Sequence, residues 1–415
     1  MSTAEPITDL PFLDAPAASP AASAAPASVA TPVLPPSIVG SAWRRRWLLA
    51  RLAGAGLGQL VRQWPGLAGA GLVLRRTWQL QRQFYGREAP RKVAVAAGRH
   101  YREYHVPGWP GAAHARYLAA TIARLAGTAT PLHTVYLAVT KKCPLACAHC
   151  FEWEALNHKE VLSRDDLHEL VARFQARQVS QLYFTGGEPL LRVADLVAVL
   201  EQARPGTDFW VITSGFNFTL ANAQRLRAAG LTGVVVSLDH HDAAAHNAFR
   251  GSPEAYADAL RAVAHARQAG LVVCLSLCAT REFTTEANLW AYARLARQLG
   301  VAFIKVLEPK AVGHYAGQAV ALGPEQVALL EAIHEKLNYD PAYHDWPIVY
   351  YYAYHQRRAG CSAAANWFVY VDTDGDLHPC PFCQRKAGSA LGPDLDQALN
   401  CVRAGVCPSF AKAAW

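Results

Sequence analysis

Three cysteines lie within eight residues in the segment KKCPLACAHCFEW, from Lys141 to Trp153. Their spacing is C-x3-C-x2-C, at Cys143, Cys147 and Cys150. A structural zinc site normally has four protein ligands, often from C-x2-C pairs, and no fourth ligand lies nearby in the sequence. Three thiolates instead suit an iron-sulfur cluster with one iron left open for another ligand. We therefore predict that these cysteines are metal ligands at a catalytic centre.

Six short apolar runs alternate with helical patterns in the region that carries this motif. Near-continuous Val, Ile, Leu, Phe and Tyr are typical of buried parallel strands, which we expect at residues 133–140, 180–186, 208–214, 231–239, 271–278 and 301–308. Helices are expected between them, with N-caps in the SRDD, SPEA and TTEA segments. Six such units predict an α/β fold, a TIM-like barrel or part of one, with the cysteine motif directly after its first strand.

Over about residues 131–315 the chain resembles the radical SAM superfamily, whose signature is C-x3-C-x2-C after the first strand of a partial (β/α)6 barrel. His149 stands before the third cysteine, where family members often have an aromatic residue. The resemblance implies a 4Fe-4S cluster on Cys143, Cys147 and Cys150, with S-adenosylmethionine (SAM) chelating the fourth iron. It also implies that SAM is cleaved reductively to methionine and a 5′-deoxyadenosyl radical, which abstracts hydrogen from a substrate.

Further motifs after the later strands resemble the SAM contacts of this family. TGGEP follows the second strand, where glycines allow close approach of the backbone and a carboxylate can bind an ammonium group. A serine follows the third strand, where many relatives have asparagine. SLD ends the fourth strand and resembles the ribose contacts, and HNAFRG supplies an arginine for the SAM carboxylate. The implied cofactor-binding residues are Gly186, Gly187, Glu188, Ser214, Ser237, Asp239 and Arg250. Each polar residue among them could instead cap a strand or a helix.

Two features near the sixth strand have open interpretations. Glu308 either faces the substrate or pairs with Lys310 or Arg281. The aromatic segment 350–355 (YYYAYH) either lines a substrate channel or packs between the barrel and the tail.

Five more cysteines lie in the C-terminal part of the chain, at Cys361, Cys380, Cys383, Cys401 and Cys407. The segment WFVYVDTDGDLHPC predicts a β-hairpin. Its aspartates imitate the start of a calcium loop, but Leu377 and Cys383 stand where glycine and glutamate are required, so calcium is not expected.

The spacing from Cys361 through Gly375 to Cys380 resembles the C-x9-15-G-x4-C opening of the SPASM and twitch domains of radical SAM enzymes. A full SPASM domain needs more cysteines than this segment has, so the resemblance implies one auxiliary 4Fe-4S cluster in a twitch-like domain. The expected ligands are Cys361, Cys380, Cys383 and Cys407, with Cys401 as the spare. Zinc at this second site is the alternative.

The positive charge of the chain is concentrated near its N-terminus. Residues 41–87 contain nine arginines and no Lys, Asp or Glu, whereas the whole chain has a formal charge of +8. The segment is loosely amphipathic, which suits an interfacial helix on anionic lipid; the alternative is a helical extension packed on the next domain. Without a recognisable nucleic-acid-binding motif, no nucleic-acid partner is expected.

The expected organisation has four parts. Residues 1–40 are a disordered Ala/Pro/Ser-rich leader and residues 41–130 a basic, mainly helical extension. Residues 131–318 form the radical SAM core barrel, and residues 319–415 form a small, cysteine-rich α+β domain with the auxiliary cluster. The N-terminus lacks the pattern of a secretory signal, so a cytoplasmic protein is expected, with peripheral membrane contact through residues 41–87.

The resemblance leaves the substrate open. Enzymes with such a tail often modify peptides or mature other enzymes, so a peptide is the first expectation. A small molecule such as a nucleotide or a lipid-linked precursor is the second, and a non-catalytic iron-sulfur protein is the third. An electron donor such as ferredoxin or flavodoxin is the expected partner.

Overall fold

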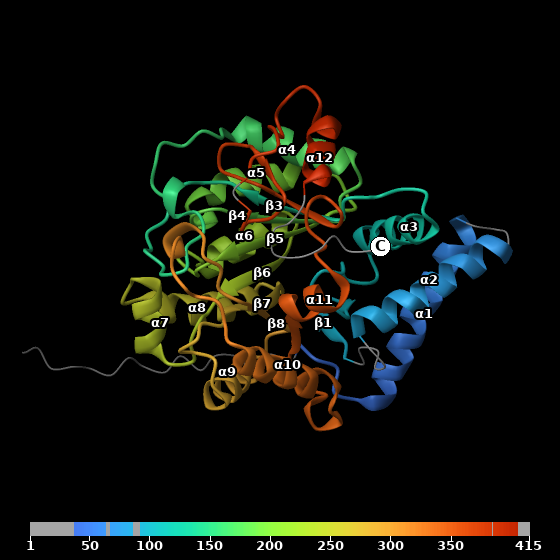
Figure 1. Cartoon of the computed structure of the whole chain (residues 1–415), viewed down its shortest axis with the longest axis horizontal. Helices are drawn as coiled ribbons and strands as arrows, with labels where there is room; N and C mark the ends of the chain where they lie inside the picture. Colours follow the sequence, from blue (N-terminus) through green and yellow to red (C-terminus); the bar gives the residue numbers. More distant parts are fainter. Residues whose placement is uncertain (1–36, 64–66, 86–91, 384, 406–415) are drawn as a thin grey trace, which may run out of the picture. The chain divides into compact units, whose positions relative to one another are not determined.

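The computed structural model describes residues 37–63, 67–85, 92–383 and 385–405 (Figure 1). The expected leader therefore lies almost wholly outside the described residues, and so does Cys407. Among the helices of the described part, none is long and apolar enough to cross a membrane.

A sheet of nine strands forms the centre of the fold, in the order β11-β10-β3-β4-β5-β6-β7-β8-β9. All its neighbouring strands are parallel except β10 and β11, which form an antiparallel hairpin. The six central strands are β3 (Thr134–Ala138), β4 (Gln181–Thr185), β5 (Asp208–Thr213), β6 (Leu231–Ser237), β7 (Val272–Cys278) and β8 (Phe303–Leu307). Each overlaps a strand expected from the sequence, which confirms the α/β class and the partial barrel.

Helices connect the strands and cover the outer face of the sheet (Figure 1). They are α4 (Arg164–Ala176), η2 (Pro189–Arg192), α5 (Val193–Gln202), α6 (Leu220–Ala229), α7 (Ala243–Arg250), α8 (Ala255–Gln268) and α9 (Glu286–Gln298). Ser163 and Thr285 cap α4 and α9 as expected. The N-cap of α8 also lies in the expected SPEA segment, but it is Glu254, which makes no side-chain cap. Short helices η1 (Trp153–Ala155) and η3 (Gly313–Tyr315) lie in the loops after β3 and β8.

The segment after residue 318 adds strands to both ends of the barrel sheet. It forms α10 (Pro324–Tyr339), η4 (Pro341–Tyr343), β9 (Ile348–Tyr351), α11 (Tyr352–Ala359), β10 (Phe368–Val371), β11 (Leu377–His378) and α12 (Leu395–Ala404). Strand β9 pairs with β8, and the expected hairpin β10–β11 pairs with β3. The cysteine-rich tail is thus bonded directly to the strand that precedes the first cysteine motif.

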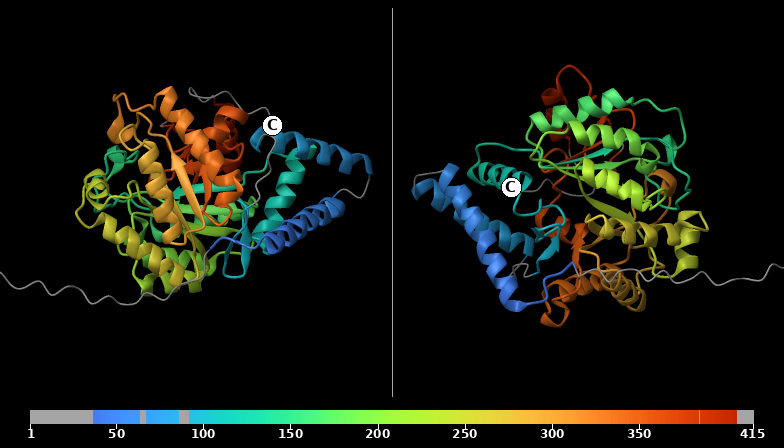
Figure 2. Two further views of the ribbon diagram at one scale, coloured as in Figure 1. Left: turned by 90° about the horizontal axis from the view of Figure 1, so that it is seen from below. Right: turned by 180° about the vertical axis from the view of Figure 1, so that it is seen from behind.

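The basic segment is mainly helical. It forms α1 (Ala42–Gln63), α2 (Leu67–Tyr85), the hairpin β1 (Ala94–Ala96) and β2 (Arg99–Tyr101), and α3 (Ala112–Ala126). Helices α1 and α2 both contact α3 (Figure 2). Tyr101 at the end of β2 and Tyr104 shortly after it are buried in the inner cluster of the barrel. Tyr101 packs with Phe303, and Tyr104 packs with Trp210 and Phe303.

Side chains of the barrel strands alternate between two buried layers. On β8, Ile304 and Val306 belong to the outer core beneath the helices, whereas Phe303 belongs to the inner cluster. The inner cluster contains Tyr104, Tyr183 and Trp210. The cavity of the interior is lined by residues at the carboxyl ends of the strands, among them Thr185, Ser237 and Leu307.

Candidate functional site

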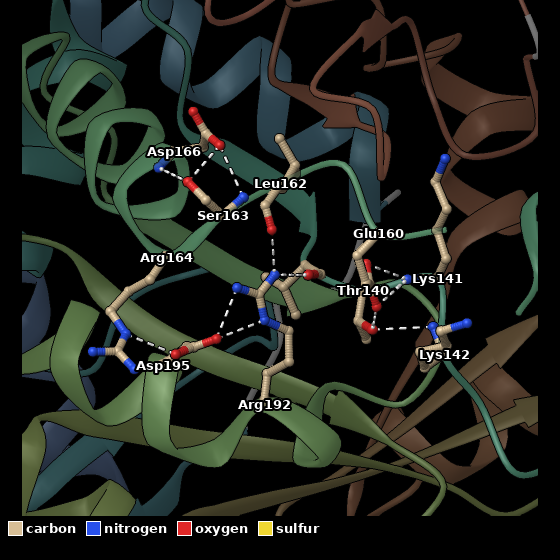
Figure 3. A network of polar contacts seen from close by, with 11 residues as sticks. Thr140, Lys141, Lys142, Glu160, Leu162, Ser163, Arg164, Asp166, Arg192 and Asp195 are labelled. Carbon is tan, nitrogen blue, oxygen red and sulfur yellow. Dashed lines mark hydrogen bonds and ion pairs between the residues drawn. The ribbon is translucent and has the colours of Figure 1, made fainter. Parts of the chain in front are cut away.

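The cysteine motif lies in the loop between β3 and α4, and the two ends of this loop are tied together (Figure 3). Near the start of the loop, the Thr140 hydroxyl donates to the Glu160 carboxylate. The backbone N–H of Lys141 donates to both oxygens of the same carboxylate, at 3.2 Å each. Glu160 stands near the end of the loop, so it closes the segment that carries the three cysteines.

Arg192 makes a second tie between the same loop ends (Figure 3). Its Nη1 donates to the carbonyl of Val139 at 2.7 Å and to that of Leu162 at 2.8 Å. The guanidinium is held in turn by Asp195 at 2.7 Å, which also binds Arg164. Sequence reasoning missed Glu160 and Arg192, because neither forms part of a recognisable motif.

The two glycines of GGEP lie against the backbone of the cysteine loop. Gly187 donates its N–H to the Thr140 carbonyl at 2.8 Å. A Cβ atom on Gly186 would come within 2.6 Å of that oxygen, and one on Gly187 within 2.2 Å of the Lys142 carbonyl oxygen. Gly186 also has a φ of 121°, which side chains rarely tolerate. Glycine is therefore required here for packing between two loops.

Two other segments also contact the cysteine loop. The N–H groups of Ala146 and Ala148 donate to carbonyls at the end of α7, at 3.3 and 3.0 Å. From η3, the N–H of His314 donates to the Cys150 carbonyl at 2.9 Å, and the His314 ring stacks on Trp153 at 3.8 Å. Three segments that follow β4, β6 and β8 thus contact the loop that carries the motif.

The three thiols of the motif face a common apolar environment. Cys147 is buried with Leu145 and Ala255, and Cys143 and Cys150 pack against this cluster. Burial raises the pKa of Cys143 and of Cys150 to about 12, and the neighbouring thiols of the motif contribute to both shifts. Three adjacent thiols are a donor set that fits an iron-sulfur cluster. Nevertheless, no three His, Cys, Asp or Glu side chains of the described residues are arranged as a formed metal site.

Glu188 is buried and its carboxylate is fully hydrogen-bonded within the protein. One oxygen accepts from the Thr213 hydroxyl at 2.7 Å and the Leu190 N–H at 3.0 Å. The other accepts from the Ser214 hydroxyl at 2.6 Å and the Ser214 N–H at 2.9 Å. Burial raises the pKa of Glu188, although these hydrogen bonds oppose the shift. Glu188 and Ser214, both predicted as cofactor-binding residues, therefore contact each other and join β4 to β5.

Arg250 and Asp239 form a buried ion pair beside the cysteine motif. Arg250 Nη2 lies 2.5 Å from Asp239 Oδ2, and its Nη1 donates to the Cys147 sulfur at 3.6 Å. The other Asp239 oxygen accepts from the Cys278 N–H at 2.8 Å. Burial alone would raise the pKa of Asp239, but Arg250, His149 and His246 lower it. Two predicted SAM contacts thus meet at one of the predicted cluster ligands.

The barrel interior forms a cavity of about 160 Å³ next to the motif. Its wall contains His149 and Phe151 from the cysteine loop, together with Ser237. Burial lowers the pKa of His149 to about 4, so its imidazole is neutral near pH 7. A second, more open cavity of about 310 Å³ contains Asp239 in its wall, and Cys278 lines both cavities. The predicted ribose contacts Ser237 and Asp239 therefore face two neighbouring spaces.

Three of the tail cysteines lie near one another. Burial raises the pKa of Cys380 to about 12, and the Cys361 and Cys383 thiols add to the shift. Cys401, expected to be the spare, is exposed on α12. Between Cys380 and Cys383, Pro381 and Phe382 line the 160 Å³ cavity. The second thiol set is therefore beside the cavity that adjoins the first.

The tail is also joined to the first motif by polar contacts. Lys141 Nζ lies 2.5 Å from Asp374 in the turn between β10 and β11. The Tyr370 hydroxyl on β10 donates to Glu152, two residues after Cys150. These contacts fix the hairpin against the cysteine loop.

Glu308 lines the cavity but is bound on several sides. Arg357 Nη1 lies 2.8 Å from one of its oxygens, to which the Tyr351 hydroxyl also donates at 2.5 Å. Lys310 Nζ lies 3.7 Å from the other oxygen, as one interpretation of the sequence expected. In the aromatic segment, Tyr352 lines the cavity, whereas Tyr351 faces the outer core. Packing is therefore confirmed for Tyr351, whereas a substrate channel at Tyr352 stays a prediction.

Part of the chain that carries this site is similar to a known family. Residues 137–296 match the radical SAM superfamily. The chain is 33% identical over 150 residues to the AdoMet-dependent heme synthase of Nitratidesulfovibrio vulgaris. The aligned region is 35% of this chain and 40% of the synthase. It is 27% identical over 299 residues to the GTP 3',8-cyclase of Xanthomonas axonopodis pv. citri. This aligned region is 65% of this chain and 84% of the cyclase. The chain thus spans less than half the length of the first relative.

A solved structure shares the fold at low sequence identity. Streptococcus suis SuiB, in a crystal structure with the precursor peptide SuiA, matches with a TM-score of 0.53 and 11% identity, covering 71% of this chain and 72% of SuiB. At this identity the likeness concerns the fold. Residues 137–296 therefore match a radical SAM domain in sequence, and the chain shares the fold of SuiB.

Proposed function

We propose that this protein is a radical SAM enzyme that cleaves SAM reductively at a 4Fe-4S cluster on Cys143, Cys147 and Cys150, and that the 5′-deoxyadenosyl radical so formed abstracts hydrogen from a peptide. The cluster would supply one electron to SAM, replenished by a donor such as ferredoxin or flavodoxin. The observation that supports this most is the place of the three thiols: they lie at the carboxyl edge of the sheet and adjoin the cavity in its interior.

The chain's own residues would bind and orient SAM beside these thiols. Arg250 reaches the Cys147 sulfur and is the expected partner of the SAM carboxylate. Ser237 and Asp239 would contact the ribose, and their two cavities meet at Cys278. Glu188, with Gly186 and Gly187, would define the position of the methionyl group. The aromatic residues around the cavity would exclude water from the reacting atoms.

The size and charge of the cavity favour a peptide over a nucleotide. Small-molecule sites usually enclose about 300–1,000 Å³, whereas this cavity has about 160 Å³, which is room for one side chain. A nucleoside triphosphate would also need several cations. Lys305 and Lys310 line the cavity in the described part of the chain, and Lys310 lies 3.7 Å from Glu308. SuiB, which shares the fold, has been solved with a precursor peptide.

A second cluster would lie next to the substrate. We propose Cys361, Cys380, Cys383 and Cys407 as its ligands; the last lies outside the described residues. Pro381 and Phe382, in the wall of the cavity, would bring this cluster close to a bound side chain. Such a cluster could bind the substrate or take up an electron after hydrogen abstraction. Zinc remains the alternative metal at these thiols.

The proposal predicts a specific result after anaerobic reconstitution. With dithionite and SAM, the protein should form 5′-deoxyadenosine, and it should contain about eight irons per chain. About four irons with one zinc would indicate a structural zinc site in the tail. Iron without 5′-deoxyadenosine would support the electron-transfer alternative and contradict the proposed function.

We further propose that α1 docks on an anionic lipid surface. Trp43, Trp47, Leu57 and Val61 are exposed, and Trp43 is 76% accessible. Their spacings of four, ten and four residues place them on one face of the helix. The opposite face packs inward through Leu48, Leu52 and Leu60. The helix therefore has two apolar faces, of which one is exposed.

The charges around this exposed face complement anionic headgroups. Arg44, Arg46, Arg51 and Arg62 are exposed on α1, and residues 41–87 contain no acidic side chain. An apolar stripe flanked by arginines is typical of helices that lie in the membrane interface. The arginines would remain with the headgroups while the tryptophans enter the acyl boundary.

Vesicle flotation tests this contact. The protein should float with phosphatidylglycerol-containing vesicles, less with pure phosphatidylcholine, and less at high salt. The double variant Trp43→Ser/Trp47→Ser should lose most of this binding. Val161→Ser, which removes an exposed apolar side chain elsewhere, should retain it. Equal flotation of the double variant and the wild type, or dimerisation through α1 without lipid binding, would contradict the proposal.

A further inference from the structure

Lys305 lies at the floor of the 160 Å³ cavity, on the inner face of β8. Its neighbours Ile304 and Val306 point to the outer core. Across the sheet, Lys305 aligns with Ser276 on β7, and Ser276 aligns with Ser237 on β6. All three residues line the cavity, so the ammonium group shares this space with a predicted SAM contact.

The ammonium group of Lys305 is surrounded by aromatic rings. Its Nζ lies 5.5 Å from the ring centroid of Tyr104 and 5.4 Å from that of Tyr136. Such contacts favour a cation but replace its hydration only partly. Glu308, the carboxylate of the cavity wall, binds Arg357 and Lys310. Within the described residues, no carboxylate contributes to the charge state of Lys305.

The groups that face Lys305 are neutral around pH 8, so they provide no counter-charge. Burial raises the pKa of the Cys274 thiol and of the phenols of Tyr104, Tyr136 and Tyr350. It lowers the pKa of the His105 imidazole. For Lys305 itself, burial lowers the pKa to about 8. A lysine in this setting is the group that changes charge in the mildly alkaline range.

Burying a cation costs free energy unless an anion or hydrogen-bond acceptor compensates it. We propose that Lys305 docks a carboxylate of the substrate, so that the substrate presents either an acidic side chain or a C-terminus to the floor of the barrel. This inference rests on the proposed function, because it takes the cavity as the substrate site. The apolar part of the bound residue would contact Phe151, Tyr352 and Phe368, which line the same cavity.

Two pairs of small probes distinguish the two sources of a carboxylate. N-acetylglutamate N′-methylamide and its glutamine isostere differ only in a side-chain carboxylate. N-acetylalanine and N-acetylalaninamide differ only in a terminal carboxylate. Binding to the anaerobically reconstituted protein is measured by saturation-transfer NMR at pH 7. We expect one acid to bind about tenfold more tightly than its amide, as for a charge-assisted hydrogen bond.

Variants of Lys305 test whether this preference comes from the proposed contact. Lys305→Met should remove the preference for the acid, and Lys305→Arg should retain most of it. Lys336→Met is the matched control, because Lys336 is an exposed lysine on α10 with one aromatic contact, 5.7 Å from the Trp290 ring. That variant should behave as the wild type. Equal binding of both acids and amides, no binding of either acid, or a preserved preference in Lys305→Met would overturn the proposal.

The pH dependence of binding gives a second readout. The probe acids are ionised above about pH 5, so the preference should be constant up to pH 7. It should decline as the pH rises through about 8, where Lys305 loses its proton. A bound carboxylate stabilises the ammonium form, so saturating acid should move this decline to higher pH. A preference that is unchanged up to pH 10 would contradict the role of Lys305.

SAM cleavage measured on the same preparations separates the two proposals. If SAM is cleaved but acids and amides bind equally, the Lys305 proposal alone fails. If the acid is preferred and Lys305→Met abolishes the preference, but no 5′-deoxyadenosine forms, the proposed function fails while the anion site stands.

Discussion

Cys147→Ala is expected to reduce the formation of 5′-deoxyadenosine to background. Cys147 is the most buried cysteine of the motif, and its sulfur accepts a hydrogen bond from Arg250. Loss of outer-shell partners alone costs metal sites about 10–100-fold in affinity or activity, so loss of a ligand should cost more than about 100-fold. The measurement is the yield of 5′-deoxyadenosine after anaerobic reconstitution, with iron content determined on the same sample.

Cys401→Ala is the control for this variant. Cys401 is exposed on α12 and is the spare cysteine of the tail in our assignment. Its alanine variant should therefore cleave SAM at the wild-type rate. If Cys147→Ala also cleaves SAM at that rate, the proposed assignment of the first cluster is wrong.

Arg250→Met is expected to lower the free energy of unfolding by about 3–5 kcal/mol, because it leaves one member of a buried ion pair uncompensated. The side chains of Arg250 and Asp239 are 9% and 3% exposed. Asp239→Asn/Arg250→Met should recover part of the loss, since the double variant contains no buried charge at this pair. Urea unfolding followed by circular dichroism measures both values.

The pH dependence of this variant has a defined sign. In the wild type, burial opposes ionisation of Asp239, but Arg250 keeps the pKa of Asp239 low. The ion pair therefore adds stability, which is lost as the pH falls through the pKa of Asp239. Without Arg250, burial raises the pKa of Asp239, and protonation then relieves the destabilisation. The difference between variant and wild type should therefore shrink toward acid pH.

Arg261→Met provides the matched comparison. Arg261 pairs with Asp258 at the surface, where its side chain is 56% exposed. Such pairs contribute about 0–1 kcal/mol, so this variant should unfold nearly as the wild type does. An Arg250→Met variant that loses no more stability than Arg261→Met would show that the buried pair contributes little.

Local patterns predicted the barrel well because strands and helices have distinct periodicities. All six central strands were identified from apolar runs, and Ser163 and Thr285 were identified as caps from their own neighbours. In contrast, α7 was not predicted as a helix, and β9 was not separated from its aromatic segment. The pairing of β10 with β3 joins residues more than two hundred positions apart, and no local pattern encodes it.

The roles of motif residues depended more on their neighbours than on their type. Gly186 and Gly187 were predicted to approach a ligand, and in the structure they also pack against Thr140 and Lys142. Glu188 uses its carboxylate to bind Thr213 and Ser214. Their contacts with SAM remain predictions. These protein contacts come from loops that are distant in sequence, so spacing alone could not reveal them.

The sequence by itself determined the three thiols, their spacing and their place after the first strand of the barrel, because these features are local. Only the tertiary structure decided what they adjoin. The alternation of β8 places Lys305 inside the barrel, while the loop after β2 adds Tyr104 to the inner cluster, and the tail places Phe382 in the cavity wall. Each of these positions depends on packing between distant segments, and together they define the cavity in which a substrate would bind.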